Sequence, residues 1–521
     1  MKPRLVCLVL ALTPLLSIGG VNPKNGNFYI TYQDVSLSGK DHSLDFTRTY
    51  NSKSSHHGWT GFGWGTSYET YLVVLPDGSA LVHENGNGQQ TFYRTADVDE
   101  VKRGARQLAQ DVVTIRKDAP ETVEQLYAQL LSNEEQRATL VEQHQLRYSL
   151  MPGRVIADAR CPGSYVQATE SAYRRRGCDG ELDVFDRTGR LLSRELPDGY
   201  RFDVTYAQEQ ASQVLDSEGH RIEFQWGANG QLSAVKSGNE TTVVYEHNAK
   251  GDLVLSSDEG GNRYRYSYDA NHNLTEIRYI DDTTQQISYV SPSSAMVSSI
   301  VDREGKRTQY EYRTDPGDAQ HYWTRITVVD GDGRTASREF EFDGQLTETG
   351  VQQMQSIASH ANGRDGRTRL DDKGRPIERT DSNGVTHQFA YDERCNKVSA
   401  ITSSEQTASF VYNAQCELAR LQTQDGLRID IAYDKRGKIA RMTERQLKER
   451  SSRKTLVFVN NEQGRPIRIS WLGHGTMRVS YEANGEVREV KSTKGARMAL
   501  AITGLFQNLL RVVKQADISY D

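Results

Sequence analysis

The chain has 521 residues, a net charge of −5 and a pI near 6.2. A nucleic-acid-binding domain needs a basic face, and this charge balance does not provide one. Mean hydropathy is −0.69, and tyrosine is twice as frequent as phenylalanine, with 26 residues against 13. This composition favours many short, half-exposed strands joined by glycine turns over one thick aliphatic core.

The first segment has the layout of a secretory signal peptide. Lys2 and Arg4 precede an apolar run at residues 5–16, and the small residues Ser17 and Gly19 suit a cleavage site. We therefore expect a signal peptide over residues 1–19 and export to the periplasm, the cell surface or the medium. An uncleaved anchor or a misassigned start codon is the alternative. No run of 18 apolar residues occurs, so we expect no membrane span in the mature chain.

Residues 20–95 contain three segments rich in glycine and aromatic residues, which are VNPKNGN, RTYNS and GFGWG. The last of them looks like a phosphate-binding loop, but no strand–loop–helix pattern surrounds it. Packing of aromatic side chains against glycines explains it better. We expect an N-terminal domain over residues 20–95, continued at 160–184.

Residues 96–159 break the strand pattern and predict an α-helical insertion. Val123, Leu126 and Leu130 recur at helical spacing, and Pro120 suits a helix start. Such an amphipathic stripe most often packs on the surface of a domain. A docking element or a plug is the alternative.

A repeat of about 21 residues runs through residues 185–492. Its aromatic anchors include Phe185, Tyr206, Trp226, Tyr268, Tyr289, Tyr391, Tyr412 and Tyr433. Glycines four residues after an anchor position include Gly189, Gly230, Gly374 and Gly437. In seven units another glycine precedes the anchor by seven residues. Each unit therefore predicts a strand, a turn, a strand and a turn, and stacked units bury the apolar face that one hairpin cannot.

The unit G-x6-Y-D-x2-G-x-L resembles the YD repeats of the Rhs family of bacterial secreted proteins and of their animal relatives, the teneurins. Residues 20–95 resemble the N-terminal domain that precedes these repeats in Rhs proteins. The resemblance implies a mainly β fold in which stacked hairpins spiral into a hollow shell, which in full-length members encloses a C-terminal toxin. We expect this chain to be a short form without the self-cleavage core and the toxin of the long family members. Because fewer than about a dozen units do not suffice to close a shell, we expect an open or partner-completed one.

Four cysteines follow the predicted signal peptide. Cys395 and Cys416 each lie four residues after an anchor, where other units have the turn glycine. In the spiral that the resemblance implies, residues at one phase of successive units lie side by side. Neighbouring strands lie about 4.8 Å apart, and a disulfide needs Cα atoms about 4.4–6.8 Å apart. We therefore expect a Cys395–Cys416 bond, with Cys161 and Cys178 as the second pair. Two unrelated buried thiols are the alternative. No CxxC motif indicates zinc or redox chemistry.

Residues 493–521 predict an amphipathic helical tail, with Leu500, Leu505 and Leu509 on its apolar stripe. This tail could be a lid on the open spiral, and a truncated or recombined gene end is an equal alternative.

Catalytic motifs do not stand out. The 12 histidines are scattered, and no HExxH, GxSxG or P-loop pattern occurs. Residues 330–333, DGDG, suit a hairpin turn better than a calcium loop, because the downstream acidic ligand is missing. We therefore predict no enzymatic activity, no cofactor and no metal.

Three functional hypotheses follow. The first is an exported, non-catalytic Rhs-like shell that encloses or presents a polypeptide cargo, or pairs with a second Rhs-type protein, in a toxin or intercellular-competition system. The second is a cell-surface adhesion protein whose exposed tyrosines stack on glycan rings. The third is a truncated remnant without a present role. Fold resemblance alone does not decide between them.

Overall fold

The computed structural model describes residues 20–514, apart from 40–41, 159, 239–240, 362, 405–406, 449–452, 462–463 and 483–486. The predicted signal peptide at residues 1–19 lies outside the described residues.

Three small sheets form the N-terminal part of the chain. The first has the order β1 (Gly20–Val21), β2 (Phe28–Ser38), β3 (Ser43–Asn51) and β6 (Trp64–Thr66). The second pairs β4 (His57–Gly58) with β5 (Gly61–Phe62), and the third contains β7 (Tyr71–Val74), β8 (Ala80–His83) and β9 (Gln90–Tyr93). In β3 every second side chain is buried, because successive residues of a strand point to opposite faces.

Three helices follow, in the segment for which the sequence predicts them. They are α1 (Val98–Arg116), α2 (Thr122–Leu131) and α3 (Glu134–Gln143). Asp97 caps α1 by accepting hydrogen bonds from the backbone amides of Asp99 and Glu100, which satisfies donors that the first turn leaves free. The buried stripe of α1 packs against Leu75 and Leu81 of the N-terminal domain.

Over the described residues, 31 strands then form one antiparallel sheet in which each strand pairs with the next along the chain. The first half contains β10 (Val155–Ala157), β11 (Tyr165–Ala168), β12 (Ala172–Arg176), β13 (Leu182–Asp186), β14 (Leu191–Glu195), β15 (Arg201–Ala207), β16 (Gln210–Asp216), β17 (Arg221–Trp226), β18 (Leu232–Ser237), β19 (Thr241–His247), β20 (Leu253–Ser257), β21 (Arg263–Tyr268), β22 (Leu274–Arg278), β23 (Thr284–Tyr289) and β24 (Val297–Val301). The second half contains β25 (Arg307–Asp315), β26 (Asp318–Val329), β27 (Thr335–Leu346), β28 (Gln352–Ala361), β29 (Arg364–Leu370), β30 (Pro376–Thr380), β31 (Thr386–Asp392), β32 (Lys397–Ser403), β33 (Thr407–Tyr412), β34 (Leu418–Thr423), β35 (Leu427–Tyr433), β36 (Ile439–Gln446), β37 (Lys454–Asn460), β38 (Pro466–Trp471), β39 (Gly475–Tyr481) and β40 (Val487–Ser492). The expected mainly β fold of stacked hairpins is confirmed.

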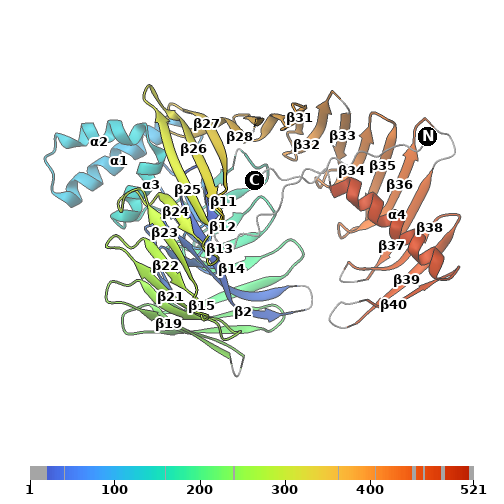
Figure 1. Ribbon diagram of the computed structural model, residues 1–521, viewed down its shortest axis with the longest axis horizontal. Helices are drawn as coiled ribbons and strands as arrows, with labels where there is room; N and C mark the ends of the chain where they lie inside the picture. The colour runs from blue at the N-terminus through green and yellow to red at the C-terminus, as the bar shows by residue number, and fades with distance from the viewer. Residues whose placement is uncertain are drawn as a thin grey trace.

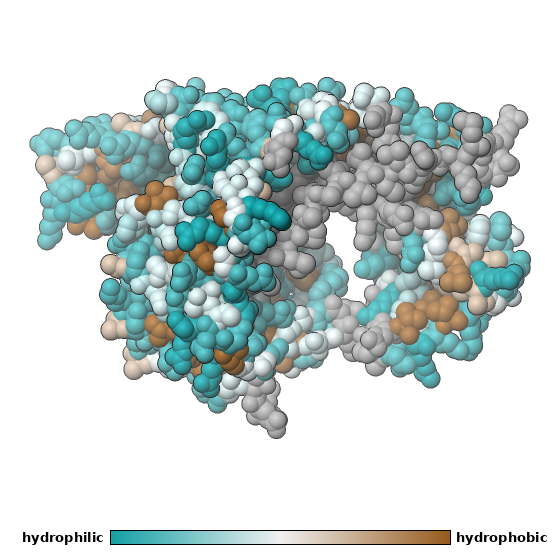
Figure 2. Space-filling view, in the orientation of Figure 1, coloured by the Kyte–Doolittle hydropathy of each residue, from teal (hydrophilic) through white to brown (hydrophobic). Residues whose placement is uncertain are grey.

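The sheet curls into two arms (Figure 1). In the first arm, β11–β24 surround β2 of the N-terminal sheet, and β25–β28 lead across to the second arm, β31–β40. Helix α4 (Ala496–Lys514) lies against the last strands of the second arm, chiefly β38, β39 and β40. Figure 2 shows an opening between the two arms.

Each arm has its own apolar core. In the first, the N-terminal residues Phe28, Phe46 and Trp64 pack against strands β15–β24 of the long sheet. In the second, Ile502 and Leu509 of α4 join a buried cluster whose other members come from strands between β31 and β39. Leu500 is 73% exposed, so the expectation that it belongs to the apolar stripe of the tail is wrong.

Candidate functional site

A recurring hydrogen bond ties many of the repeat units to the one before. The polar tip of the anchor side chain donates to a backbone carbonyl that lies 14 or 15 residues earlier, near the start of a strand. The bonds are Tyr206 to Leu191 (2.9 Å), Trp226 to Ala211 (2.7 Å), Tyr289 to Leu274 (2.9 Å), Tyr312 to Val297 (2.8 Å), Tyr391 to Pro376 (2.7 Å), Tyr412 to Val398 (2.7 Å), Tyr433 to Leu418 (3.0 Å) and Tyr481 to Pro466 (3.1 Å). Tyr268 differs, because its hydroxyl accepts from Trp64 Nε1 at 2.9 Å.

The anchor rings belong to the apolar face of the sheet. Tyr206, Trp226 and Tyr268 contact the first core, whereas Tyr391, Tyr412 and Tyr433 belong to the second. Burial raises the pKa of the Tyr206 and Tyr289 hydroxyls well above the ordinary value, so they stay protonated donors. The anchors therefore hold the sheet together from its apolar side.

A β-bulge lies at eight of these anchors, whereas the register is regular at Tyr312. The strand register shifts immediately before Tyr206, Trp226, Tyr268, Tyr289, Tyr391, Tyr412, Tyr433 and Tyr481. A bulge bends its strand and increases the local twist. These bulges therefore give the long sheet a recurring source of curvature.

The turn glycines hold a left-handed backbone. The φ angles are +94° at Gly189, +79° at Gly230, +80° at Gly374 and +74° at Gly437, which glycine adopts without the strain of a Cβ atom. At Gly374 the amide donates to Asp371 O at 3.0 Å, while Asp371 Oδ1 accepts from Arg375 N at 2.8 Å. This arrangement explains why an Asp or Asn so often precedes the glycine by three residues.

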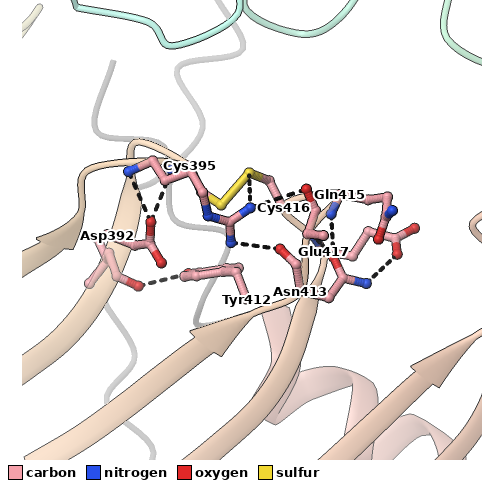
Figure 3. The surroundings of a disulfide bond; sticks show 10 residues. Asp392, Cys395, Tyr412, Asn413, Gln415, Cys416 and Glu417 are labelled. Atoms are coloured by element: carbon pink, nitrogen blue, oxygen red, sulfur yellow. Dashed lines mark hydrogen bonds between the residues drawn. A yellow bond between two sulfur atoms is a disulfide. The ribbon is translucent and has the colours of Figure 1, made fainter.

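Cys395 and Cys416 form a disulfide between two such turns, with Cα atoms 5.3 Å apart (Figure 3). Cys416 has φ +61° and takes the place of the glycine, as expected. Cys395 does not: the left-handed residue is its neighbour Asn396, with φ +51°. Asp392 still pairs with Lys397, so this turn is one residue longer than its equivalents. The same extra residue explains why Tyr412 reaches back 14 residues instead of 15.

The second disulfide joins Cys161 to Cys178, with Cα atoms 5.8 Å apart. The two disulfide-bearing regions meet, because Asn396 Nδ2 donates to Arg160 O at 2.5 Å. Residues 236 apart in sequence are thus brought together after one circuit of the sheet.

A buried ion pair joins the N-terminal sheet to the repeats. Arg48 Nε donates to Asp34 Oδ2 at 2.6 Å, and Arg48 Nη2 donates to Ser256 Oγ of β20 at 2.6 Å. The guanidinium lies over the Tyr32 and Trp64 rings, 4.5 and 4.7 Å from their centroids. Burial raises the pKa of the Asp34 carboxyl, and the positive charge of Arg48 opposes this rise. Arg48 is not among the residues predicted from the sequence, although it shares the inward phase of Leu44, Phe46 and Tyr50 on β3.

A second buried charge cluster joins the third N-terminal sheet to the repeats. Arg175 contacts Glu84 at 2.5 Å and Asp183 at 2.9 Å, and Arg194 Nε donates to Asp183 at 2.6 Å. These residues come from β12, β13, β14 and the residue after β8. They fix the N-terminal domain at a second position.

Helix α3 contacts a distant hairpin of the sheet. Buried Arg137 donates to Leu130 O at 2.7 Å and to Thr349 O at 3.1 Å, in the turn between β27 and β28. Gly350 lies against the same helical unit: a Cβ added there would lie 2.1 Å from the carbonyl carbon of Ser132. The insertion is thus tied both to the N-terminal domain and to the middle of the sheet.

The described residues offer little for small-molecule chemistry. Within them, no group of three or more His, Cys, Asp or Glu side chains is placed to hold a metal ion. One cavity of about 160 Å³, lined in part by Leu72, Tyr148 and Tyr173, is smaller than the typical ligand pocket of roughly 300–1,000 Å³. No described helix is long and apolar enough to cross a membrane. The extended apolar face and its ordered anchors are the dominant feature.

Two segments match known protein families. Residues 19–93 match a domain of unknown function, DUF6531, and residues 247–284 match the RHS Repeat. The second match includes the anchor Tyr268 and its bulge. The long sheet thus contains an RHS Repeat at residues 247–284, as the resemblance of its unit implied.

Similar proteins share only parts of their length with this chain. Over 79 residues it is 33% identical to the tRNA nuclease WapA of Bacillus subtilis (strain 168) and to the tRNA(Glu)-specific nuclease WapA of Bacillus subtilis subsp. natto (strain BEST195), which is 15% of this chain and 3% of each relative. A crystal structure of TcdB2-TccC3-TEV aligns with 95% of this chain and 28% of that chain, at 10% identity and a TM-score of 0.37. A Photorhabdus luminescens Tc holotoxin pore aligns with 90% and 27%, at 9% identity and a TM-score of 0.37.

Proposed function

We propose that the chain is an exported, non-catalytic scaffold whose curled repeat sheet encloses or presents a partner polypeptide in a toxin or intercellular-competition system. The observation that carries this proposal is the apolar face of the curled sheet, which forms a core in each of the two arms. Burial of apolar area is non-directional, so such a face can hold a polypeptide without a specific pocket.

The two disulfides support the export part of the proposal. Structural disulfides persist in oxidising compartments and are rare in the cytosol. Mass spectrometry of the mature protein should find the chain beginning near residue 20, with Cys161–Cys178 and Cys395–Cys416 linked. A chain that retains Met1 and four free thiols would contradict export.

Glycan binding through exposed tyrosines stays a prediction, and the anchor tyrosines do not add to its support. Their rings pack into the two cores, and their hydroxyls donate to backbone carbonyls, so the faces needed for stacking on sugars are engaged. The prediction that the gene is a remnant stays a prediction.

Affinity purification from the native cells, without reductant, tests the scaffold directly. The proposal expects a polypeptide at a stoichiometric ratio to the chain, or a second Rhs-type protein in the same complex. The Val411→Asp variant changes an exposed side chain of β33 and should co-purify with the same partner as the wild type. A clean preparation without any polypeptide partner would refute enclosure.

A further inference from the structure

Helix α4 covers the apolar face of the last strands with a regular stripe of side chains. Ile502 and Leu509 are fully buried, and Leu505 and Phe506 between them are partly buried. The Phe506 ring lies 5.0 Å from the Phe458 ring of β37, measured between centroids. This spacing of three, four and seven residues is that of one face of an amphipathic helix.

Few polar contacts fix this helix in place among those of its side chains that the structure describes. Among the described residues, the hydrogen bond between α4 and the sheet joins the Thr503 hydroxyl to Met477 Sδ at 3.8 Å, which is a weak acceptor. The N-terminal sheet is held very differently, because Arg48 and Tyr50 make short hydrogen bonds to Ser256 and to Leu274. Apolar contact alone is non-directional, so the sheet can exchange α4 for another helix with the same pattern.

The strands beneath α4 leave room for the helix where a glycine replaces a larger side chain. Gly475, at the start of β39, has no side chain, and a Cβ added there would lie 3.0 Å from Met498 Cγ of the helix. Together with Phe458, Ile469 and Met477, it forms what we name the α4 seat. Helices recognised in grooves of this kind insert apolar residues at positions i, i+3 or i+4, and i+7.

We propose that α4 occupies, within the same chain, a binding surface for an amphipathic helix of the partner polypeptide, and that the partner binds the α4 seat by displacing it. This inference rests on the proposed scaffold function and adds the chemical class of the bound segment. The resident helix lowers the apparent affinity for the partner, because only the fraction of molecules with α4 released can bind. The seat is thereby kept covered until a partner is present.

The test uses the full-length chain and a fluorescent peptide with the sequence of residues 496–514. The double variant Ile502→Asp and Leu509→Asp releases α4, because each buried apolar contact is replaced by a charge. We expect saturable peptide binding to this variant and binding at least about tenfold weaker to the wild type. The matched control is Leu500→Asp, which changes the exposed side of α4 and should behave as the wild type. Adding Met477→Asp to the double variant should abolish binding.

Two results would overturn the inference. One is a released variant that keeps its strand signal in circular dichroism but does not bind the peptide. The other is hydrogen exchange in the wild type that protects the amides of α4 as strongly as those of β36–β39, since a displaceable helix must open independently of the sheet. Hydrogen exchange is measured on the wild type and needs no variant. It therefore tests whether α4 opens independently of the sheet even if the double variant loses its strand signal.

The test of the α4 seat can succeed or fail independently of the test of the scaffold proposal. Peptide binding with no native polypeptide partner would leave the seat established and refute enclosure as the resident state. A native partner whose binding is unchanged by release of α4 would support the scaffold and refute the seat.

Discussion

Arg48 illustrates how single residues join the N-terminal domain to the repeats. Its guanidinium neutralises Asp34, donates to Ser256 and lies over two aromatic rings, all within the core. We expect Arg48→Met to destabilise the first arm by about 3–5 kcal/mol, because the Asp34 carboxylate then stays buried without a counter-ion. Urea unfolding followed by tryptophan fluorescence measures the change.

The pH dependence of this variant identifies the cause. A carboxyl whose pKa is raised in the folded state contributes stability that is full below the unfolded pKa and is lost as pH rises through the folded pKa. Removal of Arg48 removes the charge that opposes the rise, so the deficit should grow from about pH 4 toward neutral pH. Asp34→Asn in the same chain should recover part of the loss. A deficit that does not change with pH would assign the effect to packing alone.

The turn glycines allow a cleaner test of backbone conformation. Gly374 has φ +80° and no atom within 4 Å of an added Cβ, so Gly374→Ala introduces left-handed strain and nothing else. We expect a loss of about 1 kcal/mol, seen as roughly fivefold faster hydrogen exchange in β29 and β30. Gly331→Ala is the control, because that position is also open but lacks a positive φ. Equal exchange rates in the two variants would contradict this explanation.

For single residues, the sequence predicts which residue types form the anchors and turns better than it predicts the exact turn length and strand register. The Tyr anchors and the glycines four residues later could be found because they repeat. The one-residue extension of the turn between Asp392 and Lys397 could not, since the 21-residue spacing from Tyr391 to Tyr412 is unchanged. The bulges also escape detection, because a bulge is a relation between two strands and leaves no mark on either alone.

At the scale of elements, the Cys395–Cys416 bond links two consecutive hairpins of the second arm. It closes a loop of 21 residues, for which the chain-entropy relation gives about 3 kcal/mol. We expect the Cys395→Ser and Cys416→Ser double variant to become sensitive to proteases between these positions. Limited proteolysis followed by mass spectrometry locates the cuts.

The other disulfide provides the comparison. Replacing Cys161 and Cys178 by serine should open residues 161–178 to protease and leave the second arm resistant. Cleavage of the second arm in both double variants would show that the two regions unfold together.

The elements themselves were well predicted where their periodicity was strong. The strand alternation and the helical insertion appear in the structure close to the expected residues. The tail helix was also expected, but its packed face was misjudged at Leu500, which is 73% exposed. A single amphipathic stripe does not specify which neighbouring apolar residue points to the sheet until the sheet is in place.

At the scale of the whole molecule, the contact of the helical unit with the β27–β28 turn closes the first circuit of the sheet. We expect Gly350→Ala to break this contact, because its new Cβ would lie 2.1 Å from the Ser132 carbonyl carbon. The result should be a larger radius of gyration in small-angle X-ray scattering and faster hydrogen exchange in α3.

The control for this variant is Gly384→Ala. Gly384 has a similarly left-handed backbone, with φ +80° against +75°, but an added Cβ there would lie in open space. Gly384→Ala should therefore leave the radius of gyration unchanged. An increase in both variants would mean that backbone strain, and not the lost contact, opens the molecule.

Contacts between residues far apart in the chain were the part of the fold that the sequence could least predict. The contacts of Arg137 with Thr349 and of Asn396 with Arg160 join residues more than 200 positions apart. Such contacts depend on the accumulated twist of many strands, which local periodicity does not specify.

The recurring bulge at the anchors has a consequence for how such a chain can change in size. If every unit adds the same small rotation, then adding units lengthens the arc while its radius stays the same. The volume that the sheet surrounds is then set by how many units the gene encodes, and not by the side chains of any one of them. Duplication or loss of a whole unit would enlarge or reduce this capacity in discrete steps, with each new unit already carrying its own tyrosine, bulge and turn.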